Sequence, residues 1–332
     1  MNPGSMNLAS AIATFATAQA SSALDPAADQ AAAIDDVWNL MLWICGTMYL
    51  LVMIGVAFAV WRHRALRRNQ PVATPSESGL TGAIAVWIAL IVLGLAALTI
   101  TSFLVDRKLI PGNDAALNIR ITGRQWWWKI EYLSDDPSQQ FETANELHLP
   151  VGRKTHIELR SDDVIHSFWV PNLAGKRDLI PGRINEIELT PRRTGTFRGP
   201  CAEFCGLQHA KMSLLVSVDD DAAFDTWRAQ QLSDAPQPSD GLARQGESLF
   251  THTACVMCHA VRGTSASSNA GPDLTHLASR RTLASGALPL ERGTLAAWLA
   301  DPQRIKPGTN MPQVRLDPDQ LNALVAYLLS LK

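Results

Sequence analysis

Two long apolar runs near the beginning of the chain constrain its fold more than any other feature. Residues 37–61 and 80–104 contain no charged side chain. Each run is longer than the roughly 20 residues with which a helix crosses about 30 Å of hydrocarbon. The core helix of a large globular domain would be equally apolar, but two such runs separated by a polar loop favour a transmembrane hairpin. We therefore predict a membrane protein with two transmembrane helices.

The loop at residues 62–79 predicts how this hairpin is oriented. Short loops rich in basic residues stay in the cytoplasm. Four arginines directly follow the first run: Arg62, Arg64, Arg67 and Arg68. Both chain termini are then expected outside, which in a bacterium is the periplasmic side of the inner (plasma) membrane. Residues 1–20 end in Ala-Gln-Ala and resemble a signal peptide that lacks a positively charged start.

The region beyond the hairpin changes character twice. Residues 116–231 consist of short β-rich stretches broken by turn residues, a pattern typical of a β-sandwich or barrel. The Pro/Ser/Asp-rich residues 232–241 are typical of a semi-rigid linker, and residues 242–332 favour a small all-α domain. Its last helix is expected to begin at Asp317, with a capping box completed by Gln320. The formal net charge of -2 provides no basic field that would attract nucleic acid.

The second of two cysteine pairs has the pattern of covalent haem attachment. Cys255 and Cys258 are followed directly by His259 in the segment CVMCH. In c-type cytochromes the two sulfurs bind the haem covalently and the histidine becomes an axial ligand of the iron. A redox dithiol would leave the histidine unexplained, and a zinc site would need a second pair. Met311, in a loop with a proline on either side, is the expected sixth ligand, and His276 is its rival.

The first cysteine pair lies in a loop rich in soft metal ligands. Cys201, Cys205, His209 and Met212 follow one another closely there. A disulfide formed outside the cell would leave the histidine and the methionine unexplained. Zinc gains little from a thioether, whereas thiolate, imidazole and methionine together select copper. A mononuclear copper site and a two-copper site bridged by both thiolates are both open on this pattern, and either needs another nitrogen ligand.

Three upstream histidines are candidates for that nitrogen ligand. His148 and His156 alternate with apolar residues on predicted strands, where a surface or hydrogen-bonded histidine is the usual outcome. His166 lies at a turn into an apolar strand that a proline follows. We therefore expect His166 to complete the copper site.

Residues 241–332 resemble a class I cytochrome c. The segments GESLFTHTACVMCHA, GPDLT and IKPGTNMP carry this resemblance, together with the closing helix. It implies one covalently bound haem c. In that family Gly246 and Phe250 lie where the first helix crosses the last, near Tyr327.

Residues 33–232 resemble subunit II of the haem–copper cytochrome c oxidases. The segments DDVIHSFWVPNLAGKRDLIPGR and GPCAEFCGLQHAKM carry this resemblance, with the two-helix hairpin ahead of a cupredoxin-like domain. The fused cytochrome c makes the chain similar to the caa3-type oxidases. The resemblance implies a dinuclear copper centre, CuA, in which both thiolates bridge two coppers. Its implied ligands are His166, Cys201, the Glu203 carbonyl, Cys205, His209 and Met212.

Two further roles are implied by the same resemblance. The side chain of Glu203 would face a magnesium site shared with subunit I. Trp126, the first aromatic residue of GRQWWWKIEY, would lie on the surface above the copper centre and receive electrons. Packing near a membrane also explains tryptophans, so that alternative stays open. Ile84 departs from the family pattern, because it takes the place of a glutamate that aids proton uptake into subunit I.

The function that follows is electron relay in a caa3-type cytochrome c oxidase. Electrons from a soluble or membrane-bound cytochrome c, or from another donor, would pass through haem c and CuA to haem a of subunit I, where oxygen is reduced to water. Subunit III and membrane lipid are the other expected partners. Two alternatives are the corresponding subunit of a CuA-containing nitric oxide reductase and a non-catalytic copper-binding assembly factor.

Overall fold

The computed structural model describes residues 21–66, 76–112 and 115–332. The chain forms two compact units. One unit comprises residues 32–110, and the other combines residues 1–31 with residues 111–332. The expected signal peptide lies outside the described residues, as does the middle of the expected cytoplasmic loop.

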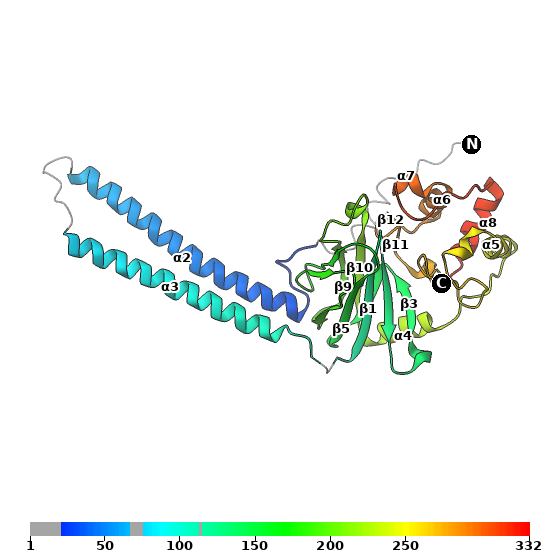
Figure 1. The fold of residues 1–332 in the computed structure, drawn as a ribbon, viewed down its shortest axis with the longest axis horizontal. Helices are drawn as coiled ribbons and strands as arrows, with labels where there is room; N and C mark the ends of the chain where they lie inside the picture. Colours follow the sequence, from blue (N-terminus) through cyan, green and yellow to red (C-terminus); the bar gives the residue numbers. More distant parts are fainter. Residues whose placement is uncertain (1–20, 67–75, 113–114) are drawn as a thin grey trace. The chain divides into compact units, whose positions relative to one another are not determined.

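The first unit is a pair of long helices, α2 (Asp29–Leu66) and α3 (Glu77–Lys108) (Figure 1). Both contain windows that are long and apolar enough to cross a membrane, and none of the residues in those windows is buried within the unit. Helices that are apolar on every side are typical of membrane spans. Both helices extend beyond the apolar runs predicted from the sequence, because the polar residues at their ends continue the helical turns.

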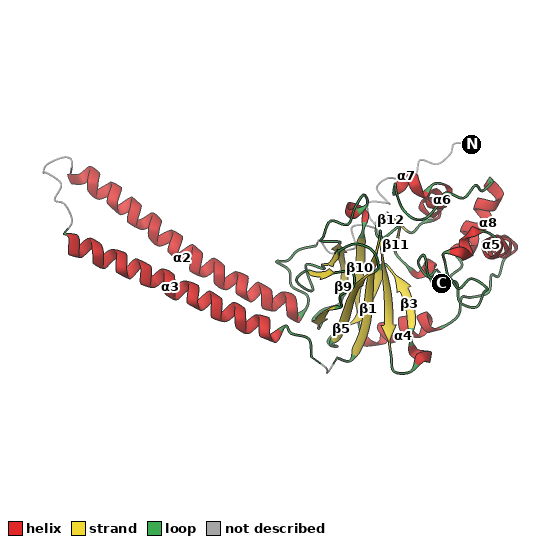
Figure 2. Ribbon diagram, in the orientation of Figure 1, coloured by secondary structure: helices red, strands yellow, loops and turns green. Residues whose placement is uncertain are grey.

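The second unit contains a β domain with two sheets (Figure 2). The larger sheet has the strand order β3-β2-β1-β5-β8, the smaller sheet has the order β4-β10-β9, and a separate hairpin pairs β6 with β7. The strands are β1 (Leu117–Arg124), β2 (Trp127–Leu133), β3 (Phe141–Ala144), β4 (Glu146–Pro150), β5 (Thr155–Ser161), β6 (His166–Phe168), β7 (Arg177–Leu179), β8 (Asn185–Leu189), β9 (Gly195–Pro200) and β10 (Ser213–Asp219). Short 3-10 turns lie at η1 (Pro137–Gln139) and η2 (His209–Lys211). The expected cupredoxin-like sandwich is confirmed.

Alternating strand residues build the core of this sandwich. In β2, Trp128, Ile130 and Tyr132 are buried, whereas the residues between them are partly exposed. The period of two along a strand places these three side chains on one face of the sheet. Helix α4 (Asp221–Leu232) packs Trp227 against this core, with its ring centroid 5.3 Å from that of Tyr132. The sandwich is therefore a rigid support for the loops at its ends.

The chain after residue 240 forms a small helical domain. Its elements are α5 (Gly241–His252), η3 (Ala254–Met257), η4 (Leu277–Ser279), β11 (Thr282–Leu283), β12 (Leu288–Pro289), α6 (Arg292–Ala300), α7 (Pro302–Ile305) and α8 (Pro318–Leu328). A Cβ added at Gly246 would lie 2.0 Å from the carbonyl oxygen of Ala323, so α5 and α8 cross at the glycine. Phe250 and Tyr327 pack at this crossing with ring centroids 5.7 Å apart. This is the crossing expected from the cytochrome c resemblance.

Local sequence explains where these helices begin. The Asp317 carboxylate accepts the N–H of Gln320 at 2.8 Å, and the Gln320 side chain accepts the N–H of Asp317 at 3.1 Å. The expected capping box is thus present. Asp240 likewise accepts the N–H of Ala243 at the start of α5. Pro318 occupies the first helical position of α8, where its missing N–H costs nothing.

Candidate copper and haem sites

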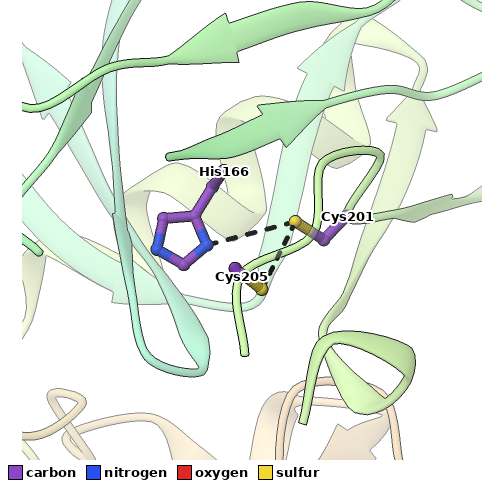
Figure 3. Close-up of side chains that lie close together, drawn as sticks. All are labelled: His166, Cys201 and Cys205. Atoms are coloured by element: carbon purple, nitrogen blue, oxygen red, sulfur yellow. Dashed lines mark hydrogen bonds between the residues drawn. The ribbon is translucent and has the colours of Figure 1, made fainter. Parts of the chain in front are cut away.

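Three of the expected copper ligands meet in one buried cluster (Figure 3). His166 begins β6, whereas Cys201 and Cys205 lie in the loop between β9 and η2. The Sγ atom of Cys201 is 4.0 Å from Nδ1 of His166 and 3.9 Å from Sγ of Cys205. The two sulfurs are too far apart for a disulfide, whose bond length is about 2.05 Å. One imidazole and two thiols are thus gathered as ligands for a soft metal ion.

The remaining expected ligands surround the same two sulfurs. The Sγ atom of Cys205 is 3.6 Å from Nδ1 of His209 and 3.9 Å from Sδ of the buried Met212. The carbonyl oxygen of Glu203 is 3.3 Å from Sγ of Cys201. All the atoms that the sequence singled out as copper ligands therefore lie together, although they come from two distant parts of the chain.

The orientation of His166 is determined by its neighbours. Its Nε2 lies 2.8 Å from Oδ1 of Asp163, which leaves Nδ1 directed at Cys201. A Cβ added at Gly123 would lie 2.7 Å from the imidazole, so only glycine leaves room for the ring. Burial opposes a charged imidazole, but the contacts with Asp163 and Cys201 outweigh it and raise the pKa of His166. Metal-bound histidines usually have their second nitrogen held by such a carboxylate, so this arrangement fits a ligand.

The two thiols of the cluster influence each other's ionisation. The contact with Cys205 lowers the pKa of Cys201 despite the opposing effect of burial, and the same contact raises the pKa of Cys205. Two thiolates this close repel each other, so the pair by itself favours one thiolate and one thiol. A metal cation bound to both sulfurs would remove this conflict, because it stabilises both as thiolates.

The two rival histidines have other partners. Nδ1 of His148 lies 2.6 Å from Oδ2 of Asp219, and the ring stacks on a tryptophan of α4. Nε2 of His156 lies 3.9 Å from Oε1 of Glu186. Neither histidine belongs to the metal-ligand cluster found among residues 21–66, 76–112 and 115–332. They are hydrogen-bonded or paired strand residues, which is the usual outcome for such positions.

Glu203 faces two different neighbours. Its carbonyl oxygen is directed at Cys201, whereas its carboxylate lies 3.6 Å from the ammonium of Lys176. The Glu203 side chain is 42% exposed. An exposed ion pair of this kind contributes little to stability, so the carboxylate is available to other partners.

A cavity of about 370 Å³ lies beside the CVMCH segment. Cys255, Cys258, His259 and Met311 all line it. Most other lining side chains are apolar, among them Phe250, Leu295, Leu299, Leu324 and Leu328. An apolar cavity with two cysteines, a histidine and a methionine on its walls fits a covalently bound haem.

The imidazole of His259 is held by its neighbours in a way that leaves one ring nitrogen free. Its Nδ1 donates a hydrogen bond to the carbonyl oxygen of Pro272 at 2.7 Å, which leaves Nε2 as the lone-pair donor. Burial lowers the pKa of His259, and the neutral ring is the form that binds iron. A Cβ added at Gly271 would lie 2.8 Å from the ring, so this glycine allows the close approach.

The loop that carries Met311 is held by one glutamine. Nε2 of Gln303 donates to the carbonyl oxygens of Thr309 at 2.8 Å and of Met311 at 2.9 Å. Its Oε1 accepts the N–H of Gly308 at 2.9 Å. Three hydrogen bonds from one side chain therefore shape the loop around the methionine.

His276, the rival sixth ligand, is engaged elsewhere. It is 2% exposed, and its ring nitrogens lie 2.9 Å from the carbonyl oxygen of Lys332 and 3.1 Å from that of Ser233. It is not among the residues that line the cavity. Within the described part of the chain, Met311 is therefore the better candidate.

Trp126 connects the copper cluster with the haem cavity. Its indole N–H donates to the carbonyl oxygen of Cys205 at 2.8 Å, and its side chain lines the cavity together with Gln125 and Trp127. The family resemblance implies a surface residue, but Trp126 is only 7% exposed because the cytochrome domain covers it. One wall of the haem cavity therefore comes from the β domain.

Several residues at these sites are not predicted by any local sequence pattern considered above. Asp163 lies three residues before His166, and the frequent carboxylate–histidine contact of metal sites was a usable signal for it. Arg280 lines the haem cavity, and its buried Nε has no hydrogen-bond partner among the described residues. Lys306 donates to the carbonyl oxygen of Trp126 at 2.6 Å, across 180 positions of sequence. Such long-range contacts leave no local pattern that sequence reasoning can detect.

Known protein families match both domains of this chain in order. Residues 133–218 match the family described as "Cytochrome C oxidase subunit II, periplasmic domain", and residues 243–332 match the cytochrome c family. The cytochrome c oxidase subunit 2 of Alkalihalophilus pseudofirmus is 34% identical over 319 residues, which cover 93% of this chain and 90% of the relative.

A further relative and a solved structure are also subunits II of cytochrome oxidases. The cytochrome c oxidase subunit 2 of Bacillus sp. strain PS3 is 33% identical over 262 residues, which cover 74% of this chain and 71% of the relative. Among solved structures, the periplasmic domain of subunit II of cytochrome oxidase from Bradyrhizobium japonicum is 33% identical, with a TM-score of 0.34, and the match covers 37% of this chain and 96% of that one. With a relative matched along nearly its whole length, the chain belongs to the cytochrome c oxidase subunit 2 family and carries a fused C-terminal cytochrome c domain.

Proposed function

We propose that this chain is the subunit through which electrons reach a caa3-type cytochrome c oxidase. Membership in the subunit 2 family makes it part of a haem–copper oxidase and a partner of subunit I. The proposed route leads from cytochrome c or another donor to haem c, then to CuA, and finally to haem a of subunit I, where oxygen is reduced to water. Subunit III is proposed as a further partner.

One observation carries this proposal. Trp126 lines the cavity bordered by His259 and Met311, and the same indole donates a hydrogen bond to the backbone of Cys205. A single side chain thus reaches from the proposed haem to the proposed copper ligands. A copper-binding assembly factor would have no use for such a connection.

The residues at both sites fit the proposed cofactors. When bound, a c-type haem and a dinuclear copper centre would each accept and release one electron at a time. The chain contributes the ligand set: a histidine with a free nitrogen and a methionine for iron, and thiols, imidazoles and a thioether for copper. Cys201 and Cys205, with their sulfurs 3.9 Å apart, are the proposed bridges.

The chain also restrains these ligands before any cofactor binds. Asp163 orients His166, the carbonyl of Pro272 orients His259, and Gln303 shapes the loop of Met311. Ligands that cannot rearrange keep a site in nearly the same geometry in both oxidation states, which favours fast electron transfer. This restraint supports a relay rather than a site that converts a substrate.

The proposed location follows from the hairpin and the family. The protein is membrane-anchored, and we propose that the basic loop between α2 and α3 is cytoplasmic and that both redox domains are periplasmic. The exposed carboxylate of Glu203 is the proposed contribution of this chain to a magnesium site shared with subunit I.

The proposed route is tested at Trp126 in the intact oxidase complex. In Trp126→Ala, haem reduction by an external donor should keep its rate, whereas copper reduction after rapid reduction of the haem should become slower. Trp126→Phe is the matched comparison, because it keeps an aromatic ring but loses the N–H that donates to Cys205 together with part of the ring surface. Metal and haem analysis accompanies the kinetics, with two coppers and one covalent haem expected per chain. Unchanged copper reduction in Trp126→Ala, or zinc in place of copper, would overturn the proposal.

A further inference from the structure

Two neighbouring residues of the β domain link the copper loop to the loop that carries Met311. The side chains of Gln125 and Trp126 both donate to the carbonyl oxygen of Cys205, each at 2.8 Å. Their own carbonyl oxygens accept hydrogen bonds from the cytochrome domain. Asn310 donates to Gln125 at 3.3 Å, and Lys306 donates to Trp126 at 2.6 Å. The side chains of this dipeptide therefore bind the copper loop, and its backbone binds the cytochrome domain.

Lys306 is the unusual member of this arrangement. Lysine side chains are almost never fully buried, yet Lys306 is 2% exposed. Its ammonium donates to two carbonyl oxygens, that of Trp126 in the β domain and that of Ala284 at 3.1 Å in the cytochrome domain. Burial lowers its pKa to about 7, partly offset by the nearby Cys205. A buried ammonium group needs hydrogen-bond acceptors. One acceptor comes from each domain, so the Lys306 ammonium links the two domains.

The position of Lys306 gives this contact a consequence for electron transfer. Lys306 lines the haem cavity, and it lies five positions before Met311 in the same loop. Its partner Trp126 contacts the copper loop through the indole N–H. The ammonium therefore links the Met311 loop to the residue that connects both sites.

We propose that Lys306 is a positioning residue for electron transfer between the two redox domains, because its ammonium binds the Trp126 carbonyl and holds the Met311 loop against the copper loop. This inference rests on the function proposed above. The step that it assists moves one electron, which oxidises the haem iron and reduces the copper centre, and no covalent bond is made or broken. The role of Lys306 in this step is to position the loop and not to carry the electron.

The first test measures domain contact in the full-length protein without reference to activity. Lys306→Met keeps an unbranched side chain that is one atom shorter and removes its charge and its hydrogen bonds. The reporters are the backbone N–H groups of Arg281 and Thr282, which cross the domain interface to Glu146, each at 2.8 Å. Their hydrogen–deuterium exchange should become roughly ten- to a hundredfold faster, the range expected when a hydrogen bond to a charged group is lost. Arg304→Met is the matched control, because it removes an exposed cation two positions away.

The second test separates positioning from a general role in folding. Lys306 also lines the haem cavity, so the haem and copper contents of Lys306→Met in the oxidase complex are measured first. In protein with full haem and copper, the reduction of copper that follows rapid reduction of the haem should become slower. Should this variant fold poorly, Asn310→Ala removes the other hydrogen bond from the same loop and should slow copper reduction by a smaller factor. Interface exchange and copper reduction that match those of Arg304→Met would overturn the role of Lys306. Absence of haem-to-copper transfer in the unmodified protein would instead overturn the proposed function.

Discussion

Glu146 offers the strongest test of how the cytochrome domain is attached to the β domain. One oxygen of its carboxylate accepts three hydrogen bonds from the cytochrome domain: the backbone N–H groups of Arg281 and Thr282 at 2.8 Å each, and the Thr282 hydroxyl at 3.0 Å. Glu146 is 6% exposed, so water cannot readily replace it. Glu146→Leu keeps a side chain of similar size and removes all three acceptor contacts.

The structure allows the size of this effect to be worked out. Each backbone N–H that is left buried without an acceptor costs about 1–3 kcal/mol. Two such groups weaken the docking of the two domains by about 2–6 kcal/mol. The loss cannot exceed the docking free energy itself, because the domains can separate and expose the N–H groups to water. Glu146→Gln retains one acceptor oxygen, replaces the other oxygen with NH2 and loses the charge, so its effect should be about 1 kcal/mol.

Hydrogen–deuterium exchange at Ser213 measures this loss. Its backbone N–H donates to the carbonyl oxygen of Ser285 at 2.9 Å, across the same interface but without contact to Glu146. Exchange at Ser213 should be about thirtyfold faster or more in Glu146→Leu, which corresponds to about 2 kcal/mol. Exchange inside the sandwich, where Ile121 pairs with Ile130, should stay the same. Equal exchange at Ser213 in Glu146→Leu and in the unmodified protein would refute the docking role of Glu146.

Two further predictions concern the separate domains. Gly246→Ala should destabilise the cytochrome domain by about 1–3 kcal/mol, because its Cβ would lie 2.0 Å from the backbone oxygen of Ala323. Thermal unfolding measures this loss. Gly293→Ala is the neutral control, because no atom lies within reach of a Cβ there. Burial raises the pKa of Asp219, but the hydrogen bond with His148 outweighs this and lowers it. That stabilisation is present above the unfolded carboxyl pKa of about 3.9 and is lost as pH falls through the lower folded value. Asp219→Asn should therefore be less stable than the unmodified protein at neutral pH, with the difference in urea unfolding disappearing in acid, and a difference that grew in acid would contradict this reasoning.

Much of the fold could be predicted because it depends on local sequence. The two apolar helices follow from composition, the strands from alternation, and the start of α8 from Asp317 and Gln320. The crossing of α5 and α8 at Gly246 was expected from the family resemblance and is observed. These features depend on neighbouring residues or on a pattern that related chains share.

The candidate sites were predictable only in part. The two cysteine pairs are dense enough to be found by their spacing, and the context of His166 favoured it over His148. The residues that orient these ligands are different. Lys306 looks like an ordinary surface lysine in the sequence, and its burial results from the contact between two domains, as does that of Trp126. Sequence patterns report which side of a helix or strand is buried, but not which domain will cover it.

The shared wall of the haem cavity has a consequence for protein engineering. Gln125, Trp126 and Trp127 line that cavity although they belong to the β domain, and Lys306 of the cytochrome domain donates a hydrogen bond to the Trp126 carbonyl oxygen. A cytochrome module transplanted from this chain into another scaffold would lose this wall and would carry a buried lysine to an exposed surface. Conversely, a foreign cytochrome joined to this β domain would lack a partner for the Trp126 carbonyl. Either domain can therefore be exchanged for a foreign one only if the contact residues on both sides of the interface are exchanged with it.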